Sequence, residues 1–311
     1  MMRELSTLML YLTAFILVVR GPYALRAKPS RPGWLAGAFG LVAVMCLGFV
    51  VPVQAIDAVM GSRGYWNLLG AISTTLSFHF MYQAILIHTS KTRPRHYSLY
   101  LMLGIASYSA AFSLITGEQE RFTSVEAFIA ALIYQPWTAL YLSIYLSTVA
   151  IISLLSLMAV LDSPQRSKVF IAGFFLVTLG NTVDICLLWL QHLNAVSTQA
   201  SVLLYSSYVA AFFTGAIILC IGFLRGSIQS LRKYWAFLYY ALRLRGILGR
   251  TVTEKPSVAA ALRDPKIICY QTLILIRDLM TLGEFVVDDS ELALTHRTDV
   301  LLTEFPLTSS T

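Results

Sequence analysis

Charged residues are scarce in this chain. They make up 13% of its 311 residues, whereas hydrophobic residues make up 57%. A soluble globular domain carries about 25% charged residues. So few charges cannot cover a water-exposed surface, which excludes an ordinary cytosolic enzyme and a disordered protein. The composition indicates a protein that lies mainly in lipid.

Cysteines and catalytic motifs are also rare. The four cysteines fall in apolar segments or near the C-terminus, so no extracellular disulfide and no Cys/His metal site is indicated. The chain has no phosphate-binding loop and no hydrolase, zinc-protease or kinase motif. We therefore assign no catalytic residue, metal or cofactor and expect no nucleic-acid partner. Nothing in the sequence favours an enzyme.

Long apolar segments dominate the first 224 residues. A transmembrane helix needs roughly 20 mostly apolar residues. These segments are too long for barrel strands and do not alternate with period two. They predict an all-α, multi-pass membrane domain over residues 1–224 with seven spans, Leu5–Val19, Trp34–Val53, Asn67–His88, Ser98–Thr116, Trp137–Leu161, Val169–Leu193 and Ser201–Leu224.

The basic residues predict the orientation of these spans. Lys and Arg accumulate on the cytoplasmic side of membrane proteins. Most of them follow the first, third, fifth and seventh spans, and the opposite side holds only Arg3, Arg63 and Arg121. We therefore expect the N-terminus outside and the C-terminus in the cytosol. We expect the location to be the plasma membrane of a bacterium.

Residues 225–250 form a basic, aromatic segment after the last span. A helix there would lie on the inner leaflet, where each basic residue gains roughly 1 kcal/mol beside anionic lipid. A straight continuation of the seventh helix into the cytosol is the alternative. The residues expected to face lipid are Arg232, Lys233, Arg243 and Arg245.

Residues 251–311 form an acidic cytosolic tail. Asp264 suits an N-cap, Pro265 the first helical position and Gly283 the end, which predicts a helix over 265–282. This helix is apolar around most of its circumference, so it must be buried. We expect it in the core of a small tail domain or in a dimer interface, with an eighth span as the alternative. The last dozen residues are expected to be disordered.

Ionisable and amide side chains inside spans are the candidate functional residues. In the sixth span Asn181 and Asp184 share a helix face, and in the third span His79 and Gln83 do the same. The two pairs lie at similar depth, so they would form a polar site for proton or ion passage. The same residues would also serve as contacts between helices, and Asp184 could instead lie in the outer headgroup zone.

Several short local patterns are spread over nearly the whole chain. They are Ala55–Ile56–Asp57 with Gly61, Gly173 with Gly180, Leu231–Arg232 with Trp235, and Tyr270 with Ile274 and Ile276–Arg277–Asp278. Together they resemble a bacterial family of seven-helix membrane proteins that are often labelled transporters and share a cytosolic C-terminal domain of unknown function. This chain has Lys233 and Leu275 where the family has Pro and Glu. The resemblance implies a transporter.

Two functional hypotheses follow from these patterns. The first is a transporter of a small solute or ion that uses the polar site between the third and sixth spans. The second is a membrane sensor or signalling scaffold whose tail binds a cytosolic protein or a second copy of the chain. The tail interface would be formed by Tyr270, Ile274, Arg277 and Asp278.

Overall fold

The computed structural model describes residues 2–26, 30–59, 64–115, 122, 124–164, 166–249, 256–283 and 288–304. Within these residues all regular secondary structure is helical. The chain divides into two compact units, residues 1–225 and 226–311. The basic segment 225–250 therefore groups with the rest of the tail. The expected disorder of the last dozen residues is wrong for residues 300–304, which end a helix, and residues 305–311 lie outside the described part.

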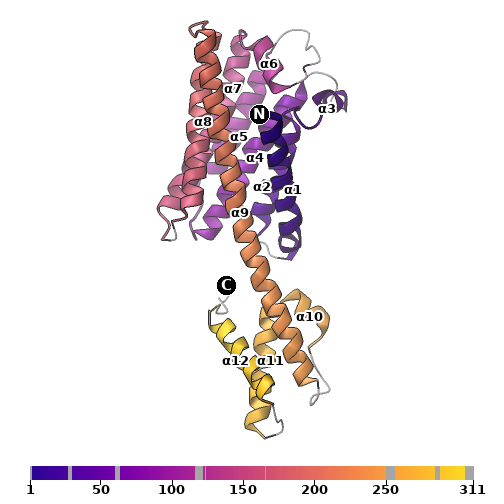
Figure 1. The fold of residues 1–311 in the computed structure, drawn as a ribbon. Coiled ribbons are helices and arrows are strands. Elements are labelled where there is room, and N and C mark those ends of the chain that lie inside the picture. The colour runs from indigo at the N-terminus through magenta and orange to yellow at the C-terminus, as the bar shows by residue number, and fades with distance from the viewer. Residues whose placement is uncertain are drawn as a thin grey trace. The chain divides into compact units, whose positions relative to one another are not determined.

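The first unit is a bundle of helices whose axes are roughly aligned, with the two short helices α3 and α6 at one end (Figure 1). Helix α7 packs against α4, α5 and α8, and helix α2 packs against α1 and α4. The helices of this unit are α1 (Met2–Arg26), α2 (Arg31–Met45), α3 (Val53–Val59), α4 (Tyr65–His88), α5 (Tyr97–Ser113), α6 (Val125–Leu132), α7 (Pro136–Leu161), α8 (Lys168–His192) and the first part of α9 (Thr198–Leu248).

Four of the described helices, α1, α7, α8 and α9, are long and apolar enough to cross a membrane. The chain therefore has the helices expected of a membrane protein. Helices α2 and α5 are shorter, with 15 and 17 residues. Helix α4 has 24 residues, but its hydroxyl, amide and imidazole side chains lower its mean hydropathy. These three helices occupy the places of the second, fourth and third expected spans.

The second expected span, residues 34–53, is not one helix. Helix α2 ends at Met45, and residues 46–52 form turns and bends before α3 begins at Val53. Gly48 has a positive φ of 84°, a backbone conformation that ends a helix and that residues with a Cβ rarely adopt. Because the stretch is apolar on both sides of Gly48, its composition does not predict this break.

The connection between α6 and α7 also contains a break. Ser124 caps α6 by accepting a hydrogen bond from the Ala127 backbone N–H at 3.3 Å. Pro136 is the first residue of α7, where its missing N–H costs no helical hydrogen bond. The apolar stretch before Pro136 thus forms a short helix that is separate from α7.

The second unit consists of the end of α9 with α10 (Val258–Arg263), α11 (Pro265–Thr281) and α12 (Asp289–Glu304). Its core joins Leu244 of α9, Ile276 of α11 and Leu302 of α12. Asp264 accepts a hydrogen bond from the Ile267 N–H at 3.3 Å, and Pro265 opens α11, as the sequence predicts. Gly283 ends the helix with a φ of 72°. Helix α11 is not one of the four candidate spans.

Candidate functional site

Asp184 lines a pocket between the helices of the first unit, with a cavity volume of about 350 Å³. Its side chain comes from α8 and is only 7% exposed. The pocket wall is formed by residues of α1, α2, α4, α6, α7, α8 and α9 together with the non-helical residues Leu47 and Phe49. This burial inside a cavity sets Asp184 apart from the exposed carboxylates of the chain.

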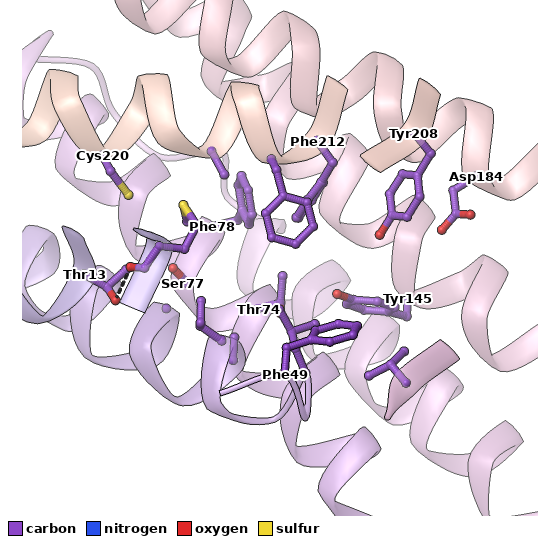
Figure 2. A pocket seen from close by; sticks show the side chains of 18 of the residues that line it. Thr13, Phe49, Thr74, Ser77, Phe78, Tyr145, Asp184, Tyr208, Phe212 and Cys220 are labelled. Carbon is purple, nitrogen blue, oxygen red and sulfur yellow. Dashed lines mark hydrogen bonds between the residues drawn. The ribbon is translucent and has the colours of Figure 1, made fainter. Parts of the chain in front are cut away.

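Most of the polar residues labelled in Figure 2 lie toward the two ends of the pocket, and Thr74 lies between them. Asp184, Tyr145 and Tyr208 lie together at one end, whereas Thr13, Ser77 and Cys220 lie at the other, with Phe212 and Phe78 between them. All of the remaining lining side chains except those of Thr74, Glu126, Gln191 and Tyr205 are apolar. The pocket is thus a mainly hydrophobic slot with a carboxylate near one end.

A second carboxylate belongs to the same pocket. The hydroxyl of Tyr205 on α9 donates a hydrogen bond to Glu126 of α6, and both residues line the cavity. The Tyr205 ring also lies 6.1 Å from that of Tyr208, measured between centroids. Glu126 therefore has a partner within the chain. Among the interactions of the described residues, Asp184 has neither a hydrogen bond nor an ion pair.

Three aliphatic hydroxyls of the lining, those of Ser77, Thr74 and Thr13, donate to backbone carbonyls. Ser77 of α4 donates to the Ala36 carbonyl of α2 at 2.8 Å, which joins the two helices. Thr74 donates to the Gly70 carbonyl of its own helix at 2.9 Å. Thr13 donates to the Met9 carbonyl at 2.8 Å. These hydroxyl protons are satisfied, and the oxygens remain able to accept a hydrogen bond.

His79 and Gln83 form a separate site on the other side of α4. The Gln83 amide donates to Nε2 of His79 at 2.8 Å, so the neutral ring holds its proton on Nδ1. Nδ1 then donates to the Tyr97 hydroxyl oxygen at 3.1 Å, and the rings of His79 and Tyr97 stack with centroids 5.5 Å apart. Neither His79 nor Gln83 is among the lining residues. The structure therefore brings Thr74 and Ser77, rather than these two residues, into the pocket that Asp184 lines.

Asn181 shares the buried face of α8 with Asp184, as expected from their spacing. It is fully buried, and its amide donates to the Val177 carbonyl at 2.9 Å. Its side-chain oxygen finds no hydrogen-bond partner among the described residues. Asn181 does not line the pocket. Of the four expected polar residues, Asp184 is thus the one that reaches the cavity.

Sequence reasoning missed Tyr145 and Glu126. For Tyr205 and Tyr208 the sequence left two roles open, lining a cavity or anchoring the helix at the membrane interface, and favoured the second. All four line the pocket. Tyr145 lies in a long apolar segment that gives no sign of which face meets a cavity. A signal was available for Tyr205 and Tyr208, because they occur three residues apart on one helix face at the depth of Asp184.

The basic residues of the tail differ in their surroundings. Arg232, Lys233 and Arg243 are exposed, and the Arg243 guanidinium lies 5.5 Å from the centroid of the Tyr239 ring. Arg245 is half-buried and donates to the Pro256 carbonyl at 2.7 Å. Arg245 therefore forms a hydrogen bond within the tail.

The expected tail interface is only partly free. Tyr270 and Ile274 are exposed by 43% and 40%, so their face of α11 is uncovered. Asp278 is exposed as well. Arg277, however, pairs with Asp299 of α12 at 3.0 Å. Arg277 thus joins two helices of its own chain.

Within the described residues no three His, Cys, Asp or Glu side chains cluster as metal ligands would. No protein-family model, no curated protein and no solved structure matches the chain. The family resemblance of the short sequence stretches therefore stays a prediction.

Proposed function

We propose that the protein spans the plasma membrane of a bacterium seven times, with its N-terminus outside, and carries a small solute or ion through the pocket at Asp184. The observation that carries the proposal is the buried carboxylate of Asp184, which lines a cavity and has no partner among the described residues. A carboxylate within the spans is costly unless it holds a proton or faces a cation. Ionisable residues that occur within spans despite this cost usually have a functional role.

The pocket itself supports passage rather than mere packing. Its lining spans a long stretch of α9, from Tyr205 to Phe223, and includes residues of six other helices. A rise of 1.5 Å per residue makes this stretch about 27 Å long, close to the thickness of the hydrocarbon core of roughly 30 Å. The pocket lining thus extends over a length comparable to most of the membrane thickness.

Transport is tested with purified protein in vesicles that hold a trapped pH-sensitive dye. A panel of small organic cations, anions and neutral solutes is added outside, and solute-coupled proton movement changes the dye signal. We expect the protein to respond to at least one solute and Asp184→Asn to lower that response at least tenfold. The matched control is Asp162→Asn, which removes an exposed carboxylate paired with Lys91 at 2.9 Å. An equal response of Asp184→Asn and the unchanged chain contradicts the proposal.

A sensor or scaffold is the second candidate, and the separate core of the tail favours it. The end of α9 packs with α11 and α12 through residues such as Leu238, Leu273 and Leu302. Here the tail would bind a cytosolic protein, and the exposed Arg232, Lys233 and Arg243 would contact anionic lipid. A chain truncated after Arg225 lacks this whole unit, so no part of the tail core is left exposed to solvent. Retained transport with lost partner capture would make the tail the signalling part.

A further inference from the structure

The pocket of the first unit is lined by charges of one sign. Its ionisable acidic residues are Asp184 and Glu126, and no Lys, Arg or His is among its described lining residues. A cavity whose lining charges are all acidic and whose walls are apolar focuses a negative potential on its interior. Such a field repels anionic solutes and attracts cationic ones.

The guanidinium of Arg20, which contacts two lining residues, does not alter this picture. Arg20 lies against Gly33, where an added Cβ would meet its Nη1 at 1.6 Å, and over the Phe223 ring at 5.5 Å. Phe223 follows Tyr208 by fifteen residues on α9. This separation amounts to about 22 Å along a helix. Arg20 is therefore at the end of the pocket remote from Asp184.

Asp184 has no counter-charge among the described residues. It is more than nine-tenths buried, its carboxylate points into the cavity beside the Tyr208 hydroxyl (Figure 2), and no cationic partner for it occurs among the described residues. A buried charge without a partner is unstable. A cationic group that enters the pocket would provide the missing partner.

The walls next to Asp184 suit an organic cation better than a hydrated metal ion. Tyr145 and Tyr208 flank the carboxylate, and Phe212 follows on α9 (Figure 2). Aromatic faces attract ammonium groups, most strongly where water is excluded. Farther along, the wall is apolar and can receive a hydrocarbon body but offers little to a hydration shell. A volume of about 350 Å³ falls in the range of pockets for small organic ligands, roughly 300–1,000 Å³.

We propose that this pocket binds a monovalent organic cation that has an ammonium group on an apolar body. The ammonium lies against Asp184 between Tyr145 and Tyr208, and the body extends past Phe212 toward Phe78. This inference rests on the proposed function, of which it names the substrate class. An ammonium could come from a soluble amine or from the headgroup of an ethanolamine lipid, and the experiment distinguishes these sources.

The experiment compares three probes of nearly the same shape. Benzyltrimethylammonium carries the positive charge, neopentylbenzene is its uncharged carbon isostere, and benzylsulfonate is the anionic counterpart. Binding to the full chain is measured by calorimetry in lipid nanodiscs made of phosphatidylglycerol only, which has no ammonium headgroup. Nanodiscs without protein correct for partition into lipid. We expect the cation to bind at least tenfold more tightly than the isostere, and the sulfonate to show no binding.

Variants connect the preference to the carboxylate. Asp184→Asn should lower the affinity for benzyltrimethylammonium at least tenfold and abolish its preference over neopentylbenzene. Asp184→Glu should keep that preference, and the surface control Asp162→Asn should leave it unchanged. The comparison of probes on the unchanged chain holds even if Asp184→Asn does not fold.

Several outcomes would overturn the inference. Equal binding of the cation and its isostere, a cation preference that persists in Asp184→Asn, or binding of sodium ions with no binding of benzyltrimethylammonium would each do so. Competition by phosphatidylethanolamine added to the nanodiscs would identify a lipid headgroup as the natural source of the ammonium, and its absence a soluble amine. Binding without transport in vesicles would contradict the proposed transport alone. Transport restricted to anionic or neutral solutes would contradict the substrate class alone.

Discussion

Gly173 of α8 and Gly215 of α9 lie so close together that neither position has room for a side chain. A Cβ added at Gly215 would lie 2.8 Å from the Gly173 carbonyl oxygen, and one added at Gly173 would lie 2.7 Å from the Leu219 side chain. Small residues allow helices in membranes to approach in this way. The contact holds α8, which carries Asp184, against α9, which carries Tyr208.

We expect Gly215→Ala to destabilise the protein by about 1–3 kcal/mol, because the methyl group has to push the two helices apart. Thermal unfolding in nanodiscs measures this loss. The control is Gly21→Ala in α1, where the nearest atom to an added Cβ is 3.8 Å away. The double variant with Gly173→Ala should cost less than the sum of the single changes, since helices already separated have room for the second methyl. A Gly215→Ala protein as stable as the unchanged one would refute the close contact.

Asp264 should contribute to the stability of the tail as the N-cap of α11. Asp264→Ala removes the acceptor for the Ile267 N–H, and loss of an N-cap costs about 1 kcal/mol. Hydrogen exchange at the first-turn amides of α11 should become faster. Asp278→Ala near the exposed C-terminal end of the same helix is the matched control and should leave this exchange unchanged, since Asp278 does not cap α11. Similar exchange in both variants would refute the capping role.

Cys269 should react slowly with thiol reagents in the folded tail. It is fully buried, and burial raises the pKa of its thiol to about 12. The thiolate is the reactive form, so little of it exists at pH 8. We expect iodoacetamide to label Cys269 at least 100-fold more slowly than a cysteine placed by Leu282→Cys, at a position that is 70% exposed. Peptide mass spectrometry distinguishes the two sites, and equal labelling rates would show that Cys269 is accessible.

The same pKa shift makes the stability of the tail depend on pH. The folded pKa of Cys269 lies above the unfolded value of about 8.5. The unfolded tail therefore loses this proton first as pH rises, which favours unfolding. The contribution of the thiol is complete below about pH 8.5 and is lost as pH rises toward 12. Cys269→Ala should weaken the loss of stability in this window, as followed by hydrogen exchange in α11. An unchanged pH profile would assign that loss to other groups.

His79 should matter for stability but not for the pocket. His79→Phe keeps the ring that stacks on Tyr97 and removes both hydrogen bonds, which leaves Gln83 and Tyr97 without this partner. Such a loss costs about 1–3 kcal/mol in unfolding free energy. Benzyltrimethylammonium affinity in the nanodisc assay should stay within twofold. A loss as large as that of Asp184→Asn would restore His79 as the functional partner of Asp184.

The sequence was sufficient to predict where most helices occur. Apart from the second, each predicted span coincides with a single helix over most of its length. The reason is that a run of some twenty apolar residues has few alternatives to a helix. Asp264, Pro265 and Gly283 were informative at the level of single residues, because capping depends on local chemistry alone.

The rotation of each helix about its axis could not be predicted. Apolar residues surround α4 on every side, so composition does not distinguish the face with Thr74 and Ser77 from the face with His79 and Gln83. Packing against α2 and α5 decides between them, through the Ser77–Ala36 and His79–Tyr97 hydrogen bonds. The position of Glu126 depends in the same way on a tertiary contact, the bond from Tyr205.

The break at Gly48 gives the pocket a wall of a different mechanical kind. Of the described lining residues, Leu47 and Phe49 alone lie outside helices. Irregular backbone at membrane depth is tolerated where it faces a cavity rather than lipid. A helical wall changes position only as a rigid rod or by losing hydrogen bonds, whereas the non-helical backbone at Phe49 has the freedom to rotate about a few bonds without that loss. The pocket can therefore change its volume at this wall while the helices beside it stay in place.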